Sequence, residues 1–350
     1  MPSVIEFLQS QLFTEIPVPT KKFTGQTIIV TGSNTGFGLE AARHFILLDA
    51  AKVILAVRSI SKGKAAAARL EESTGTKAVV EVWELDLASF ASVRSFAKQS
   101  RSLERLDILV NNAGVMTYDF VLAEKDDSLI TVNAVSPLLL SMLLLPKMRE
   151  TSLKYDKETV ITFVGSLGHA RVDFIESKSE HIFKDLAIEK TARMTVRYNI
   201  SKVIQLQLAR ELAENLTKSE KLGNIVVSLV NPGLSDTEVA RNLGWLQGII
   251  VKVVLSLVGR APEEASRTLV LAAEGGPETH GQYLDDGKVG RYVISAQITP
   301  PRKSLLGYQL PVHRPSKFIT SDEGIKVQKQ LWKELIEKLD AIAPGIVDSI

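Results

Sequence analysis

The stretch TIIVTGSNTGFGLEAARHF (residues 27–45) runs from an apolar, β-branched segment through a glycine-rich turn into a helical pattern. Such a turn can bring backbone N–H groups and the positive end of the helix onto a pyrophosphate. Gly32 would permit the tight turn, Gly36 the close approach of a phosphate, and Gly38 the packing of the helix on the strand. The spacing Gly-x3-Gly-x-Gly differs from the commonest dinucleotide-binding pattern, so a purely structural turn remains the alternative.

Similar apolar runs alternate with helical patterns through the first two-thirds of the chain. The predicted strands are TIIVT (27–31), KVILAV (52–57), AVVEVWEL (78–85), LDILVN (106–111), TVITFV (159–164), NIVVSLV (224–230) and a weaker GQYL (281–284). The predicted helices begin near Gly38, Ser61, Ser89, Asp126 and Arg197. Continuous apolar strands separated by helices predict an α/β fold with a single doubly wound (Rossmann-type) parallel sheet and helices on both faces.

Length and patterning favour one domain over residues 1–350 with appended segments. These are an N-terminal extension (1–24), an insertion (169–197), a substrate lid (234–260) and a C-terminal tail (300–350), which includes a charged helical pattern. Long loops inside a compact domain are usually lids or binding elements. The lid's apolar residues are Trp245, Leu246, Ile249, Ile250, Val253 and Val254. They would cover a substrate or, alternatively, form a helix packed wholly into the core.

Composition excludes several kinds of partner. A net charge of +2 without long blocks of like charge gives no indication of nucleic acid. The absence of cysteine excludes disulfides and thiolate chemistry, and we expect a cytoplasmic protein. His169, His181 and His280 lack metal-ligand spacing, so no metal site is predicted.

The N-terminal stretch MPSVIEFLQSQLFTEIPVP (residues 1–19) has neither the basic flank nor the continuous apolar run of a secretory signal. Its apolar residues follow a helical rhythm, which predicts a short docked helix or, alternatively, an interfacial membrane foot. Two further apolar runs, residues 134–146 and 244–259, are shorter than the roughly 18 residues that span a bilayer. No transmembrane segment is therefore predicted.

The end of the second predicted strand indicates which dinucleotide would bind. A NAD-binding enzyme is expected to place Asp or Glu there to hold the ribose hydroxyls. This chain instead reads ILAVRSISKGK, with Arg58 at the tip and Lys62 one turn later. Because a guanidinium binds a 2′-phosphate with two parallel hydrogen bonds, Arg58 indicates NADP(H). A solvated surface arginine is the alternative.

Five motifs in order, TGSNTGFG, WELDLAS, NNAG, a strand ending before Ser166, and YNISK, resemble the short-chain dehydrogenase/reductase family. The match covers roughly residues 25 to 235 in register. Within the family, the chain is most similar to the NADP-dependent retinol-dehydrogenase and carbonyl-reductase branch and to fungal biosynthetic reductases. The resemblance implies the catalytic residues Asn133, Ser166, Tyr198 and Lys202. It implies cofactor contacts by Gly32, Ser33, Asn34, Thr35, Gly36, Phe37, Gly38, Asp86, Leu87, Asn112, Ala113, Gly114, Tyr198, Lys202, Pro232, Gly233 and Thr237.

The segment between Ser166 and Tyr198 departs from the family's compact members. These residues are 32 positions apart (198 − 166), well beyond their spacing in such members. The additional chain would lie near the substrate mouth or over the helices through which relatives dimerise. A monomer and a homodimer both remain open.

Tyr198 and Lys202 lie one helical turn apart, on the same face of a helix that is apolar on most sides. A free tyrosine has a pKa near 10, too high for efficient acid–base work at neutral pH. An ammonium about 5 Å away favours the phenolate by roughly 3 kcal/mol at an effective dielectric near 20. We therefore expect Lys202 to lower the pKa of Tyr198, Ser166 to hydrogen-bond the substrate oxygen, and Asn133 to orient a water.

These expectations combine into one leading function, an NADP-dependent oxidoreductase that reduces the carbonyl of a fairly apolar small molecule or oxidises the matching secondary alcohol. A role in secondary-metabolite biosynthesis would suit the fungal resemblance. A redox-silent NADP-binding sensor or scaffold is a second hypothesis, against which the complete catalytic set argues. A third keeps the fold and substitutes cyclisation, isomerisation or dehydration for redox chemistry.

Overall fold

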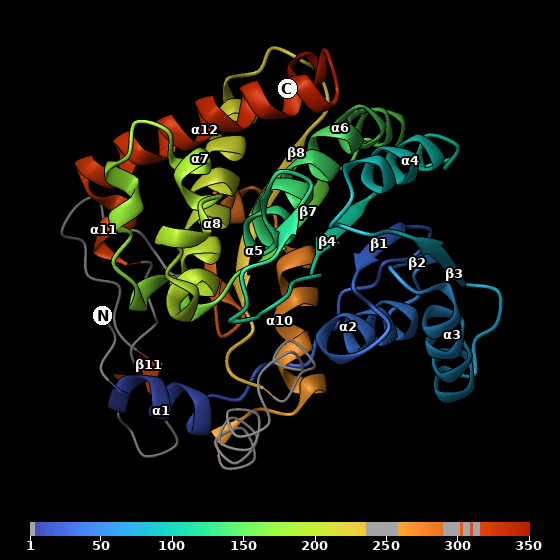
Figure 1. Cartoon of the computed structure of the whole chain (residues 1–350). Coiled ribbons are helices and arrows are strands. Elements are labelled where there is room, and N and C mark those ends of the chain that lie inside the picture. The colour runs from blue at the N-terminus through green and yellow to red at the C-terminus, as the bar shows by residue number, and fades with distance from the viewer. Residues whose placement is uncertain (1–3, 236–257, 290–301, 304–308, 311–315) are drawn as a thin grey trace.

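Eight strands form one sheet at the centre of the molecule (Figure 1). The structure is a computed structural model that describes residues 4–235, 258–289, 302–303, 309–310 and 316–350. In spatial order the strands are β10 (Lys288–Val289), β9 (Tyr283–Asp285), β8 (Ile225–Asn231), β7 (Thr159–Val164), β4 (Ile108–Asn111), β1 (Thr27–Thr31), β2 (Lys52–Val57) and β3 (Val80–Glu84). All neighbours pair in parallel except β10 and β9. The predicted doubly wound parallel sheet is confirmed, with one short antiparallel edge strand added.

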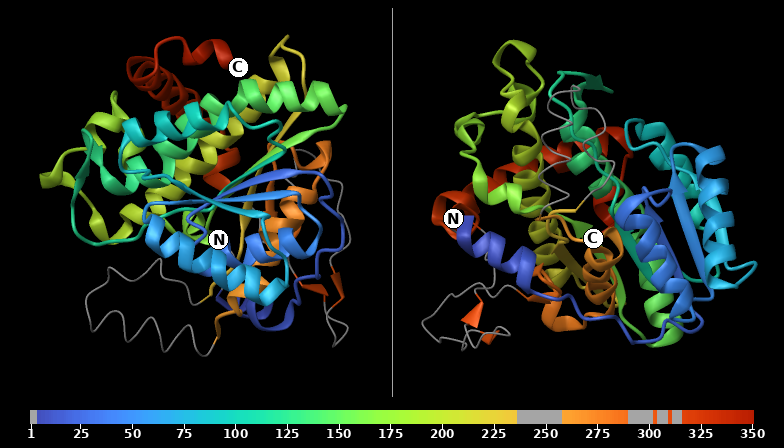
Figure 2. Two further views of the ribbon diagram at one scale, coloured as in Figure 1. Left: turned by 90° about the vertical axis from the view of Figure 1, so that its right-hand side faces the viewer. Right: turned by 90° about the horizontal axis from the view of Figure 1, so that it is seen from below.

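Helices cover both faces of this sheet (Figure 2). One layer consists of α2 (Gly36–Leu47), α3 (Ile60–Thr74) and α10 (Pro262–Glu274), and the other of α4 (Phe90–Ser100), α6 (Ser136–Tyr155), α8 (Met194–Lys218) and α12 (Asp322–Ile342). Strand β1 shows why both faces must be covered. Ile28 and Val30 point into the first layer's core, and Ile29 points into the second. Alternate side chains of a strand face opposite sides of its sheet, so a continuous apolar strand needs two apolar partners.

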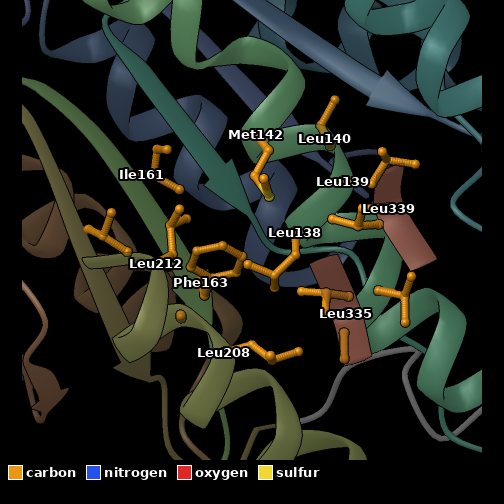
Figure 3. Packing of buried hydrophobic residues seen from close by; sticks show 14 of the residues in the cluster. Leu138, Leu139, Leu140, Met142, Ile161, Phe163, Leu208, Leu212, Leu335 and Leu339 are labelled. Carbon is orange, nitrogen blue, oxygen red and sulfur yellow. The ribbon is translucent and has the colours of Figure 1, made fainter. Parts of the chain in front are cut away.

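The core of the second layer joins segments far apart in the sequence (Figure 3). Its members include Leu138 on α6, Phe163 on β7, Leu208 on α8 and Leu335 on α12, all fully buried. Figure 1 shows α12 lying across α8 near the C-terminus. The charged helical pattern predicted for the tail is this helix, and its apolar stripe completes the core.

The helix predicted near Asp126 has a different start. A two-stranded hairpin, β5 (Leu122–Ala123) and β6 (Asp126–Asp127), precedes the short helix α5 (Ser128–Ile130). A π-turn, η1 (Thr131–Val135), then leads into α6, and in it the Ser136 N–H donates to the carbonyl of Thr131. Pro137 gives a physical reason, because it lacks the N–H that an α-helix would direct to the carbonyl of Asn133.

The predicted insertion contains short helices rather than an open loop. These are η2 (Leu167–Arg171), η3 (Ile175–Lys178), α7 (Ile182–Leu186) and η4 (Glu189–Thr191). The carboxylate of Glu334 on α12 accepts the N–H groups of Ile182 and Phe183, each at 3.0 Å. The insertion therefore rests on the C-terminal helix. Helix α8 begins at Met194, three residues before the predicted start.

Within the described residues one helical stretch, Ser128–Tyr155, is long and apolar enough to cross a membrane. It lies with 89% of its most apolar window buried inside the protein, as the central helix of a core does. The N-terminal extension forms α1 (Val4–Phe13), in agreement with the predicted docked helix. Most of the apolar run at 244–259 lies outside the described residues.

Candidate active site

A cavity of about 570 Å³ opens at the carboxyl ends of β1, β2, β3, β4, β7 and β8. This size is typical of a ligand site, and the place is where ligands bind in doubly wound sheets. Predicted residues that line it are Gly32, Asn34, Thr35, Gly36, Phe37, Arg58, Asp86, Leu87, Asn112, Ala113, Gly114, Ser166, Tyr198, Lys202, Pro232 and Gly233. The sheet thus brings together residues spread over 200 positions.

Four predicted site residues within the described part of the chain do not line the cavity. Ser33 is buried and donates from its hydroxyl to the carbonyl of Val30 at 2.7 Å. Gly38 packs beneath the cavity, Lys62 is exposed on the first turn of α3, and Asn133 is buried behind the wall. Thr237 lies outside the described residues, as do the lid residues Trp245, Leu246, Ile249, Ile250, Val253 and Val254.

The glycine turn has the geometry that close approach requires. Gly32 and Gly36 have φ angles of 64° and 58°, in the left-handed region that favours glycine. A Cβ atom on Gly32 would lie 2.9 Å from the Cα of Ala113, and one on Gly38 would lie 2.5 Å from Nδ2 of Asn112. A larger residue at either position would therefore push the turn or the start of α2 away from the segment that follows β4.

The N-terminus of α2 faces the cavity without a side-chain cap, because the hydroxyl of its N-cap residue, Thr35, makes no capping hydrogen bond. The first N–H groups of a helix need partners and carry a partial positive charge. Arg58 lines the same end of the cavity at the tip of β2. Two glycines, an uncapped helix start and a guanidinium fit a dinucleotide with a phosphorylated ribose.

Tyr198 and Lys202 reach the other end of the cavity from α8, where Ser166 follows β7. The hydroxyl of Tyr198 lies close enough to Ser166 for that side chain to act on its pKa. Lys202 donates to the carbonyl of Val164 at 2.7 Å and to Oε1 of Gln205 at 3.1 Å. Its Nζ lies 5.9 Å from the centre of the Tyr198 ring. The pair predicted from the sequence therefore does meet at one site.

The electrostatics of this pair differ from the sequence-based expectation. Burial lowers the pKa of Lys202 to about 7. Burial also raises the pKa of Tyr198, and the interaction with Ser166 acts in the opposite direction. The expectation that Lys202 lowers the pKa of Tyr198 is wrong for the protein alone. Lys202 is buried away from water, whereas Tyr198 is partly buried at the cavity wall. The hydrogens of the Lys202 amino group are directed to Val164 and Gln205 rather than to the phenol.

The side chain of Asn133 has three described hydrogen bonds to protein groups, and its predicted role in orienting a water stays a prediction. Its Nδ2 donates to the carbonyl of Val115 and to Oγ of Ser201, both at 3.0 Å, and its Oδ1 accepts the Val115 N–H at 2.9 Å. Ser201 lies on α8 between Tyr198 and Lys202. Asn133 therefore ties the cavity wall at Val115 to the helix that carries the pair.

A buried ion pair lies beside Tyr198. Arg197 and Asp127 have side chains 1% and 0% exposed, with Nε and Oδ2 separated by 3.4 Å. Burial raises the pKa of Asp127, while its hydrogen bond from the Leu129 N–H and the charge of Arg197 act to lower it. The pair joins the start of α5, which leads to Asn133, to the start of α8.

Sequence reasoning missed part of the cavity wall. Further lining residues are Ala56, Leu85, Ala88, Val115, Met116, Val132, Val164, Gly165, Leu167, Gly168, Arg171, Asn199, Asn231, Leu234 and Ser235. Asn199 could have been inferred, since it directly follows Tyr198. No sequence motif identified Arg171, because it lies in the insertion (169–197) and outside the family's motifs. Gln205 is also new, and only its contact with Lys202 identifies it.

Known proteins match this chain over most of its length. Residues 26–173 match a family model described as short chain dehydrogenase. The short-chain dehydrogenase anuD of Penicillium roqueforti is 39% identical over 98% of this chain and 85% of its own length. The short chain dehydrogenase atnD of Emericella nidulans is 42% identical over 85% of this chain and 95% of its own.

Solved structures share the fold. An uncharacterised protein from Mycobacterium paratuberculosis has 26% identity and a TM-score of 0.63, with 93% of this chain and 98% of that chain covered. The NADPH-bound carbonyl reductase from chicken fatty liver has 20% identity and a TM-score of 0.55, with 78% and 100% covered.

We expect Arg197→Met to destabilise the protein by about 3–5 kcal/mol, because it leaves the Asp127 carboxylate buried without its partner. The double variant Asp127→Asn, Arg197→Met should recover most of this loss, since the amide oxygen still accepts the Leu129 N–H and no charge remains. Urea unfolding of the two variants and the wild type measures the difference. A double variant no more stable than Arg197→Met alone would contradict the role given to the carboxylate.

Proposed function

The chain belongs to the short-chain dehydrogenase/reductase family, and we propose that it is an NADP(H)-dependent oxidoreductase for a carbonyl group on a fairly apolar small molecule. The observation that carries this proposal is the contact of Tyr198 with Ser166 beside Lys202, at the opposite end of one cavity from Arg58. The NADPH named for the chicken carbonyl reductase supports the choice of cofactor. A cytoplasmic location, a role in biosynthesis and a monomeric or homodimeric state remain predictions.

Reduction of a carbonyl needs a hydride on carbon and a proton on oxygen. Gly32, Gly36 and Arg58 would hold NADPH, which would supply the hydride when bound. Tyr198 would supply the proton, and the interaction with Ser166 acts to lower the pKa of the phenol against the effect of burial, which favours proton donation. The Ser166 hydroxyl accepts the Gly168 N–H at 3.1 Å, and its own hydrogen would donate to the substrate oxygen and stabilise the negative charge that develops there.

Lys202 would return the proton to Tyr198 through a bridging hydroxyl group or water, because its own hydrogens are directed to Val164 and Gln205. A group with a pKa of about 7 gains and loses protons readily at neutral pH, whereas an ordinary lysine does not. Its hydrogen bonds to Val164 and Gln205 hold the amino group behind the phenol. The same residues serve alcohol oxidation in reverse, with Tyr198 accepting the proton.

The described walls near Tyr198 favour an apolar substrate. Val115, Met116, Leu167 and Leu234 present apolar side chains, while Asn199 and Arg171 add polar groups. A substrate with an apolar body and a few oxygen atoms would suit this lining. Product formation without NADPH consumption would instead indicate cyclisation, isomerisation or dehydration.

Tyr198→Phe should lower kcat by about 10²- to 10⁴-fold, because it removes the proton donor and keeps the ring. NADPH binding should remain nearly unchanged. A screen of ketones, aldehydes and alcohols that follows NADPH absorbance provides the assay, and fluorescence titration provides the affinity. The control is Tyr155→Phe, which alters a surface tyrosine bonded to Glu104. Near-normal turnover by Tyr198→Phe would show that the acid is another group.

Arg58→Asp should weaken NADPH binding by about 10- to 100-fold, since a charge-assisted hydrogen-bond site becomes a repulsive one. NADH, which lacks the 2′-phosphate, should lose little affinity. Titration of both cofactors measures the ratio, with the exposed Arg94→Asp as a control for the change in net charge. Equal losses for both cofactors would refute the 2′-phosphate assignment.

A further inference from the structure

The N-terminal helix α1 reaches the cavity wall through one side chain. The amide of Gln11 donates from Nε2 to the carbonyl of Leu234 and accepts the Leu234 N–H at 3.0 Å through Oε1. Gln11 is 6% exposed and lies 223 positions from Leu234. The side chain thus satisfies both backbone polar groups of one residue, as a neighbouring strand would.

Leu234 belongs to a loop that lines the cavity. Residues 232–235 follow β8 directly, and all four are part of the lining. Inside this loop the Gly233 N–H donates to Oδ1 of Asn231 at 3.3 Å. Gly233 has a φ angle of 80°, so the loop turns sharply at that point.

The same contact zone is crowded on its outer side. A Cβ atom on Gly233 would lie 2.9 Å from Oε1 of Gln11 and 2.8 Å from a guanidinium nitrogen of Arg260. The loop therefore lies between the cavity and these two side chains. Movement of the loop outward is blocked while Gln11 and Arg260 stay in place.

A buried network fixes α1 against this loop. Arg260 donates to the carbonyls of Ser10 and Thr14 at 2.8 and 3.2 Å, and it pairs with Asp286 at 2.8 Å. The hydroxyl of Ser10 donates to Asp286 at 2.5 Å. The Arg260 N–H also donates to the carbonyl of Leu234 at 2.9 Å. Ser10, Arg260 and Asp286 are 4%, 6% and 6% exposed, so the network is shielded from competing water.

We propose that Gln11 is a positioning residue for the cavity loop at 232–235, and that α1 therefore acts as a support of the cofactor site. This inference rests on the proposed NADPH-binding function for its effect on affinity. Without Gln11 the Arg260 N–H would still hold the Leu234 carbonyl, but the Leu234 N–H would lose the partner described for it, so the loop would sample other arrangements. The ordering cost would then be met when NADPH binds, and it would appear in the dissociation constant rather than in kcat.

Gln11→Met tests this directly, because methionine keeps the length and packing of the side chain and removes both hydrogen bonds. We expect the Kd for NADPH to rise about tenfold, with kcat at saturating NADPH within about threefold of wild type. Gln11→Glu, which retains an acceptor for the Leu234 N–H and loses the donor, should have an intermediate Kd. Leu12→Ala, on the exposed side of α1, is the matched control and should leave both constants unchanged.

Hydrogen exchange in the cofactor-free protein separates this inference from the proposed function. Peptides that contain residues 232–235 should exchange faster in Gln11→Met than in wild type or Leu12→Ala. Unchanged exchange, or a lowered Tm with an unchanged Kd, would overturn the positioning role. Faster exchange in a protein that does not bind NADPH at all would support the loop contact and refute the proposed cofactor.

Discussion

One buried ammonium group constrains the rest of the candidate site. Lys202 is 4% exposed, and the partners described for its Nζ are two oxygen atoms, the carbonyl of Val164 and Oε1 of Gln205. Neither oxygen carries a full charge, so the protonated form is destabilised and the pKa falls to about 7. Such a group can be held only inside a rigid, well-packed frame. Helix α8 provides this frame, because it is buried between the sheet and α12.

The two ends of the cavity differ in their electrostatic environment. At the β1 and β2 end the chain offers positive charge to a ligand, through Arg58 and the uncapped start of α2. At the β7 and α8 end burial disfavours the charged forms of Tyr198 and Lys202, so the pKa of Tyr198 is raised and that of Lys202 falls to about 7. Both ends of the cavity lie at the carboxyl ends of the strands. In the proposed function, contacts at the first end would bind the dinucleotide and so position it for reaction beside Tyr198 at the second.

Much of this arrangement could be predicted from local sequence patterns. Continuous apolar strands, the glycine turn at Gly32 and Gly36, and the i, i+4 pair of Tyr198 and Lys202 all express short-range rules, and the sheet and the meeting of the pair follow. The direction in which the pKa of Tyr198 is shifted could not be predicted from these local patterns. It depends on where the ammonium points, and its partner Val164 lies 38 positions away on another element.

Other features could not be predicted because they depend on contacts between residues that are far apart in the sequence. The π-turn at Asn133 has a local signal, the missing N–H of Pro137, but the partners of its side chain come from Val115 and Ser201. The contact of Gln11 with Leu234 spans most of the chain. Helix α10, which was not predicted, packs on α2, although the two helices are far apart in the sequence. Such contacts are consequences of the fold and cannot be read from spacing alone.

The pKa of the Lys202 side chain provides the most direct test of the proposed site. The protein labelled with ¹⁵N-lysine, compared with a Lys202→Met variant to assign the signal, gives the pKa of this side chain by NMR titration. The buried site predicts a pKa of about 7. A value near the ordinary 10.5 would mean that the ammonium is solvated or paired with a charge, and it would contradict the arrangement of Lys202, Tyr198 and Gln205 described above.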